Sequence, residues 1–113
     1  MDVHEHLPLT EAACFILLSL APGPKHGYAV MKEVAALSDG RVVLSTGTLY
    51  GALKRMLEDG WIGRVDSRYP DDSGRARKEY RLTRLGRRVL AEETARLSKL
   101  ATLAKLRAAE AGV

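Results

Sequence analysis

The sequence predicts a mainly α-helical fold that carries a small β-hairpin and ends in one long helix. Three observations predict it. Apolar residues recur at helical spacing in four stretches of the chain, and the spacing becomes strand-like between residues 61 and 83. Clusters rich in Gly, Pro, Ser and Asp separate the stretches. Apolar residues make up 46% of the 113 residues, which excludes a disordered chain.

The first part of the chain predicts two helices and a short extended segment. Residues 1–8 are expected to form a frayed arm. Thr10 is expected to cap a first helix, which ends before "APGPKHG" because the prolines of that turn cannot continue it. A second helix is expected over residues 27–37. The β-branched run "RVVL", residues 41–44, predicts a short strand.

In the second part of the chain, the sequence predicts a third helix, a hairpin and a long final helix. The third helix is expected over residues 45–59, between a serine cap and a glycine stop. Residues 64–81 form the predicted hairpin, with "PDDSGRA" at its tip. Thr83 is expected to cap a final helix that runs to about residue 108. Three helices followed by a basic hairpin describe a winged helix-turn-helix, which divides the chain into a winged-helix domain, residues 1–82, and a C-terminal dimerisation helix, residues 83–113.

The positive charge of the chain is concentrated in one region. The formal net charge is +4. Residues 64–88 hold nine basic and four acidic residues, a net +5, whereas the rest of the chain carries a net −1. A local excess of this kind favours a polyanionic partner such as double-stranded DNA.

The exposed side of the third helix carries unusually small side chains. An apolar stripe that contains Leu49, Leu53 and Met56 is expected to face the core, and Gly47 and Gly51 fall on the opposite side. A glycine in a helix interior costs roughly 1 kcal/mol relative to alanine. The glycines are therefore either tolerated surface residues or a place where a bulky partner comes close, as a DNA major groove does. The residues of this helix expected to face DNA are Ser45, Thr46, Gly47, Thr48, Tyr50 and Lys54.

The hairpin is the second candidate DNA contact. Arginines beside a flexible glycine suit a wing that follows the phosphate backbone or enters the minor groove. The alternative is a solvated charged loop, and two neighbouring aspartates oppose DNA contact on one side of the tip. The wing residues expected to contact DNA are Gly74, Arg75, Arg77 and Lys78.

The apolar stripe of the final helix continues beyond the length that the three-helix core can cover. Either this stripe folds back on its own domain, or it packs against its twin in a homodimer, which we favour. The candidate dimerisation residues are Val89, Leu90, Leu97, Leu100, Leu103 and Ala104.

Several classes of function find no support in the sequence. No nucleophile–base pair, phosphate-binding glycine loop or cluster of metal ligands is present, so no enzyme, cofactor or metal site is expected. Cys14 is the single cysteine and is expected to be a buried small hydrophobe. No apolar run is long enough to span a bilayer, and "MDVHEHLP" lacks the basic head of a signal peptide. A cytoplasmic protein without a membrane partner is expected.

Four stretches of the chain form a recognisable combination: "LTEAACFILLSL", "HGYAVMKEV", "LSTGTLYGALKRMLEDGWI" and "GRARKEYRLTRLGRRVL". In these stretches and in their order, the chain resembles the PadR-like family of bacterial transcription regulators. The resemblance implies a winged-helix domain, a homodimer formed through the terminal helix and, in most members, repression of a promoter. It also implies that the residues named above for the third helix and the wing face DNA.

The resemblance also bears on a small-molecule effector. The single terminal helix is similar to the family's short branch, in which some members bind planar organic molecules at the dimer centre. Residues 81–113 contain no aromatic side chain, so Phe15 and Leu97 are the better candidates for contact with an effector. Two alternatives to a DNA-binding regulator stay open: a winged-helix module that binds only protein, and a small-molecule sensor.

Overall fold

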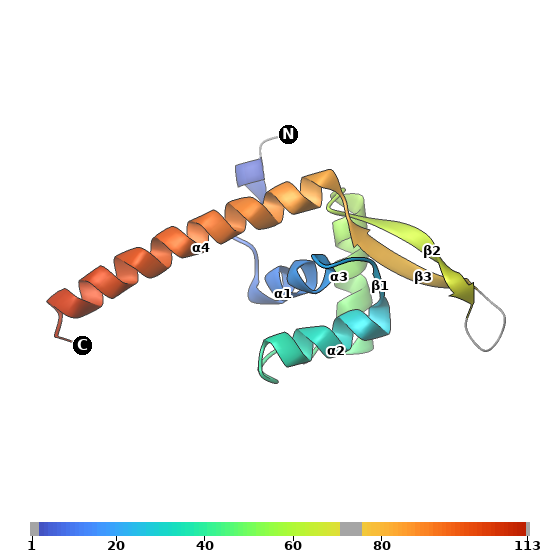
Figure 1. The fold of residues 1–113 in the computed structure, drawn as a ribbon, viewed down its shortest axis with the longest axis horizontal. Helices are drawn as coiled ribbons and strands as arrows, with labels where there is room; N and C mark the ends of the chain where they lie inside the picture. The colour runs from blue at the N-terminus through green and yellow to red at the C-terminus, as the bar shows by residue number, and fades with distance from the viewer. Residues whose placement is uncertain (1–2, 71–75, 113) are drawn as a thin grey trace.

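The computed structural model describes residues 3–70 and 76–112, and the side chains of residues 3–65 and 78–112. The chain order is η1 (Val3–His6), α1 (Glu11–Leu20), β1 (Lys25–His26), α2 (Gly27–Leu37), α3 (Thr46–Glu58), β2 (Ile62–Pro70), β3 (Ala76–Leu82) and α4 (Arg84–Glu110). Helices α1, α2 and α3 pack together on one side of a small sheet, and the wing points away from the C-terminus (Figure 1). The mainly helical winged fold predicted from the sequence is confirmed.

Side-chain caps begin all four α-helices. The hydroxyls of Thr10, Ser45 and Thr83 accept hydrogen bonds from the backbone N–H three residues later, as the sequence predicts for these positions. The fourth cap is His26, whose Nδ1 accepts from the N–H of Ala29 at 3.2 Å. Helix α3 ends before Gly60, which has a φ of +77° and reverses the chain into β2.

The core lies where α1, α2, α3 and the sheet meet. Leu49 and Leu53 of α3 and Val34 of α2 are at most 1% exposed, so the predicted apolar stripe of α3 does face the interior. Tyr80 and Leu82 of β3 close the core from the sheet side. Cys14, which was expected to be buried, is only partly buried beside this core.

The sheet has one strand more than the predicted hairpin. Strand order is β1-β3-β2, and both pairs are antiparallel. Lys25 of β1 pairs with Tyr80 of β3, so the turn after α1 is fastened to the wing. The prediction of a strand at residues 41–44 was wrong, because none of the described strands pairs with this run, which forms an irregular connection into α3.

The predicted frayed arm was also wrong for its described part. Val3 is 3% exposed and belongs to the core, and the short helix η1 packs against α4. The ring of His6 meets the indole of Trp61 edge-on, with centroids 5.1 Å apart. Burial of an apolar side chain stabilises by about 1.5–3 kcal/mol, so the burial of Val3 offsets part of the entropy cost of ordering this segment.

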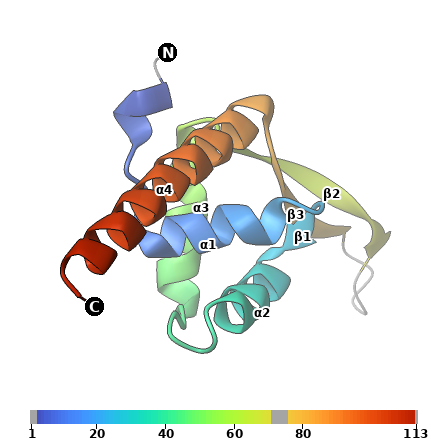
Figure 2. The same ribbon diagram turned by 60° about the vertical axis from the view of Figure 1, so that its left-hand side comes forward.

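A close backbone approach fastens the start of α4 to the start of β2. An added Cβ at Gly86 would stand 1.9 Å from the carbonyl oxygen of Trp61, so no other residue fits there without displacing backbone. The N–H of Thr83 donates to the same carbonyl at 3.0 Å. The first half of α4 is therefore part of the winged-helix core, while its second half extends away from it (Figure 2).

Glu93 joins α4 to the segment before α1. Its side chain is 1% exposed, and its Oε2 accepts from the backbone N–H of Leu9 at 2.8 Å and from Arg96 Nη2 at 3.1 Å. The hydrogen bond to Arg96 holds the pKa of this carboxyl below its ordinary value, although burial acts in the opposite direction. Both partners donate hydrogen bonds, so they favour the ionised carboxylate over the neutral acid.

The Glu93 contact predicts a specific loss of stability in acid. Because the folded-state pKa is lowered, the contribution is complete above the ordinary pKa of 4.5 and is lost as the pH falls through the lowered value. Glu93→Gln should lower the free energy of unfolding by about 1–3 kcal/mol at pH 7, since a hydrogen bond to a charged group is weakened. Urea unfolding at pH 7 and pH 3 checks this. If the difference between the two proteins does not shrink at pH 3, the ionised contact is not what Glu93 contributes.

Candidate nucleic-acid interface

One side of α3 is open to solvent along its whole length. The six predicted residues of this helix, from Ser45 to Lys54, are all exposed, whereas Leu49, Leu53 and Met56 on the other side are buried. An added Cβ at Gly47 or at Gly51 would meet no other atom within 4 Å. The fold itself therefore does not require glycine at either position.

The N-terminus of α3 presents hydroxyl groups. Ser45 Oγ accepts from the N–H of Thr48 at 3.2 Å and donates to Thr48 Oγ1 at 2.9 Å. Thr46 is exposed beside them. A helix N-terminus with free N–H groups and hydroxyls can bind a phosphate, because donors and the helix dipole both favour negative charge there.

Tyr50 is held against the start of α2. The residue is 45% exposed, and its hydroxyl lies 2.5 Å from where a Cβ of Gly27 would be. Gly27 therefore provides the space in which the ring of Tyr50 rests. This role was not predicted from the sequence. The only signal that could have shown it is the joint presence of a glycine after His26 and a tyrosine on the third helix.

Tyr50 also lies near the base of the wing. Burial raises the pKa of the neighbouring Tyr80 hydroxyl, and the proximity of Tyr50 raises it further, while Arg64 lowers it. The three side chains come from α3, β3 and β2. The open side of α3 and the sheet therefore lie close to each other at Tyr50 and Tyr80.

The wing is only partly described. Lys78 is exposed on β3 and pairs in register with Asp66 of β2. Arg77 lies in the same strand, but its side chain is outside the described residues, as are Gly74 and Arg75 altogether. Lys78 shares a strand face with Tyr80, because alternate residues point to the same side.

Two exposed residues of α2 lie close to the contact between Gly27 and Tyr50 and were not predicted. Tyr28 follows Gly27 directly and is 62% exposed, and Lys32 Nζ lies 5.4 Å from the centre of its ring. An aromatic ring with a cation above it is a stable surface pair. The sequence did not distinguish these two residues as a possible contact site, because exposed polar side chains are normal on the solvent side of a helix.

The predicted dimerisation residues fall into two groups. Val89 is fully buried and Leu90 packs partly against the core, so neither side chain is a free part of an apolar surface. Leu97, Leu100 and Leu103 are 42%, 54% and 48% exposed. Ala104 and Leu106 are exposed as well. The second half of α4 therefore carries an apolar surface that this protomer does not cover.

The two predicted effector residues lie on different elements. Phe15 is on α1 and is partly buried against the core, while Leu97 is on the extended half of α4.

Burial raises the pKa of the nearby Cys14 thiol, with Glu93 acting in the same direction. That thiol is therefore a poor nucleophile.

The described residues hold neither a metal centre nor a membrane-spanning helix. Among residues 3–70 and 76–112, no group of three or more His, Cys, Asp or Glu side chains is placed to hold a metal ion. In the same part of the chain, no helix combines the length and the apolar character that crossing a membrane requires.

Comparison with known proteins places the chain among transcription regulators. A profile described as "Transcriptional regulator PadR-like family" matches residues 16–92. A protein of Streptomyces fradiae, described as an uncharacterized 37.1 kDa protein in transposon TN4556, is 34% identical over 90 residues. Those residues are 80% of this chain and 24% of that protein, so the chain spans about a quarter of its length.

Solved structures share the fold. A PadR family transcription regulator from Clostridium difficile R20291 is 26% identical with a TM-score of 0.71, over 86% of this chain and 97% of that one. Bacillus subtilis PadR in complex with operator DNA is 21% identical with a TM-score of 0.63, over 75% of this chain and 47% of that one. At that identity the second comparison shows the fold alone.

Proposed function

Because the chain belongs to the PadR-like family of transcriptional regulators, which is not a family of enzymes, we propose that it binds operator DNA. In this proposal it acts as a homodimer, with the open side of α3 in the major groove and the wing on the backbone or in the minor groove. Repression of a promoter is the expected outcome, as the family resemblance implies. Bacillus subtilis PadR, which has the same fold, is known in complex with operator DNA, and this supports the choice of partner.

The observation that carries the proposal is the contrast between the two sides of α3. One side is fully engaged in the core through Leu49 and Leu53. On the other side, glycines stand at two positions where this protomer leaves open space. Small side chains there let a wide surface approach the helix backbone, and a major groove about 12 Å wide admits a helix in this way.

Charge and position support the same partner. Lys54 is exposed on α3, and Lys78 is exposed on the wing. Arg64 and Arg81 are exposed on the strands nearby. Cations that neutralise phosphates supply the sequence-independent part of DNA affinity. Tyr50, seated over Gly27, would present its hydroxyl to a phosphate or a sugar between helix and wing.

The homodimer rests on the uncovered leucines of α4. Leu97, Leu100 and Leu103 lie on a helix of 27 residues, of which only the first part packs on the core. Exposed leucines on such a helix can pack against the same helix of a second subunit, in an antiparallel or a parallel arrangement. A two-fold dimer would place two α3 helices roughly 34 Å apart, one turn of DNA.

A binding titration tests the proposal. The duplex is the DNA directly upstream of the protein's own gene, and affinity is measured by fluorescence anisotropy at several salt concentrations. Lys54→Ala should weaken binding and lower the slope of log K against log salt by about one unit for each subunit, because one phosphate contact is lost.

The matched control for this titration is Lys105→Ala. It removes the same charge from the far half of α4, where Lys105 is exposed. It should leave the salt slope unchanged. An equal slope for wild type and Lys54→Ala would remove Lys54 from the interface. Absence of any duplex binding above the level of unrelated DNA would contradict the proposed function.

A further inference from the structure

An apolar side chain is exposed directly before α3. Val43 is 73% exposed, more than any other large apolar side chain in the described part of the chain. It lies two residues before Ser45, the N-cap of α3. A single exposed valine is ordinary on a protein surface, so its neighbours and its position decide what it can bind.

The connection that carries Val43 is held in place from several sides. The N–H of Val42 donates to Ser38 Oγ at 2.9 Å, and the side chain of Arg41 forms an ion pair with a glutamate of α1. Val42 packs partly against the core, and Leu44 is 8% exposed. Both neighbours of Val43 therefore face the protein, and Val43 faces solvent on a backbone that is fixed by them.

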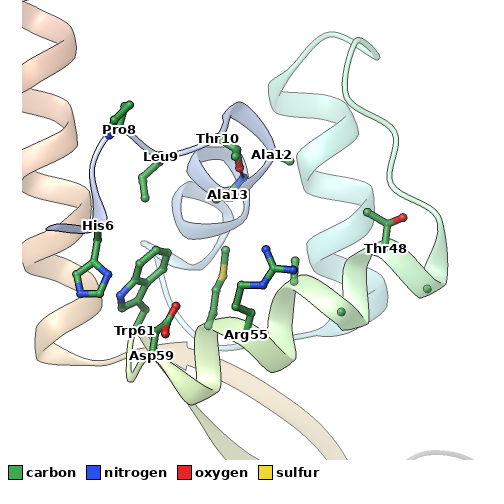
Figure 3. Close-up of a pocket in the computed structure, with 14 residues that line it drawn as sticks. His6, Pro8, Leu9, Thr10, Ala12, Ala13, Thr48, Arg55, Asp59 and Trp61 are labelled. Atoms are coloured by element: carbon green, nitrogen blue, oxygen red, sulfur yellow. Dashed lines mark hydrogen bonds between the residues drawn. The ribbon is translucent and has the colours of Figure 1, made fainter.

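The exposed side chains at the start of α3 differ in their chemistry. The hydroxyls of Ser45 and Thr48 bind each other, and Thr48 lies toward the start of α1, where it lines a groove of about 490 Å³ between α1 and α3 (Figure 3). Thr46 is exposed and also has a hydroxyl. Hydroxyls and N–H groups can bind phosphate. Val43 carries two methyl groups and no polar atom in its side chain, so it cannot.

An apolar side chain at this place has one specific partner in a DNA major groove. Thymine presents its C5-methyl group there, whereas the edges of the other bases present hydrogen-bond donors and acceptors. A contact between methyl groups removes apolar surface of both partners from water. Valine also loses little rotamer freedom when it is covered, because a β-branched side chain is stiff at χ1.

We propose that Val43 contacts the C5-methyl group of a thymine in each half-site of the operator. This inference rests on the proposed function, in which α3 enters the major groove. The hydroxyls at the start of α3 would bind the DNA backbone, and Val43 would add a preference for thymine over cytosine, which has only hydrogen at C5. The contact needs no rearrangement of the protomer, since the connection before α3 is already fixed.

Replacement of thymine by deoxyuridine tests the contact, because it removes only the C5-methyl group. The thymines of the upstream duplex are replaced one at a time, and affinity is measured by fluorescence anisotropy. For the wild type, one position in each half-site should weaken binding by about threefold to fivefold, the loss expected for one buried methyl group. Val43→Ser should weaken binding of the unmodified duplex by about tenfold, since both subunits lose the contact, and should abolish the deoxyuridine effect at that position alone. Val43→Ile keeps the apolar contact and should keep the effect.

The matched control is Leu37→Ser, which removes another exposed apolar side chain, 46% exposed at the end of α2. It should keep both the affinity and the deoxyuridine effect of the wild type. Equal effects in wild type and Val43→Ser at every thymine, or no effect at any thymine in the wild type, would overturn the thymine contact while DNA binding itself stands. Failure of the proposed function would look different and would overturn both, because then neither the wild type nor any variant would bind the duplex above the level of unrelated DNA.

Discussion

Leu97→Glu is expected to turn the proposed homodimer into monomers and to lower the affinity for operator DNA by about a hundredfold. Leu97 is half-exposed on the part of α4 that its own core does not cover. In a dimer built on this surface, the new carboxylate would be buried opposite its own copy or opposite leucines. Burial of an unpaired charge costs several kcal/mol, and each 1.4 kcal/mol is tenfold in an equilibrium constant. A monomer would then contact one half-site, without the gain that comes from linking two.

Sedimentation equilibrium measures the dissociation into monomers, and fluorescence anisotropy with the upstream duplex measures the loss of DNA affinity. The matched control is Ser98→Glu, which adds the same charge one residue further along α4. Ser98 is exposed and is turned about 100° around the helix from Leu97. It should remain a dimer. A dimeric Leu97→Glu protein, or equal dissociation of both variants, would contradict a dimer surface on the leucines.

The helices could be predicted from the sequence because their signals are local. Thr10, Ser45 and Thr83 each bind an N–H three residues later, so residue type and position were enough to place these three caps. Gly60 ended α3 for a similar reason, since its positive φ suits a chain reversal. The apolar stripe of α3 followed from periodicity alone.

The elements that were missed depend on contacts between distant residues. Strand β1 has two residues and exists because it pairs with β3, more than 50 positions later. Helix η1 is ordered by the burial of Val3 and the contact of His6 with Trp61. Residues 41–44 show the converse, because β-branched side chains form no strand without a neighbouring strand to pair with.

The candidate site was predictable in outline but not in its construction. Periodicity identified the exposed side of α3 and the glycines on it. It could not show that Gly27 makes room for Tyr50, or that Trp61 and Arg55 line one groove between the start of α1 and α3. Both facts arise from tertiary packing, in which a residue's role depends on what faces it.

The most direct test of a DNA-binding surface on α3 is the affinity of Gly47→Leu for the upstream duplex. The fold has open space at this position, so the melting temperature should be retained or slightly raised. A leucine there would stand between the helix backbone and the major groove of the DNA. We expect affinity to fall by about tenfold or more, the result of any clash that costs over about 1.4 kcal/mol, while Gly23→Leu, at a position where an added Cβ also meets nothing, binds as wild type. Unchanged affinity in a folded Gly47→Leu protein would contradict a DNA-binding surface at this position.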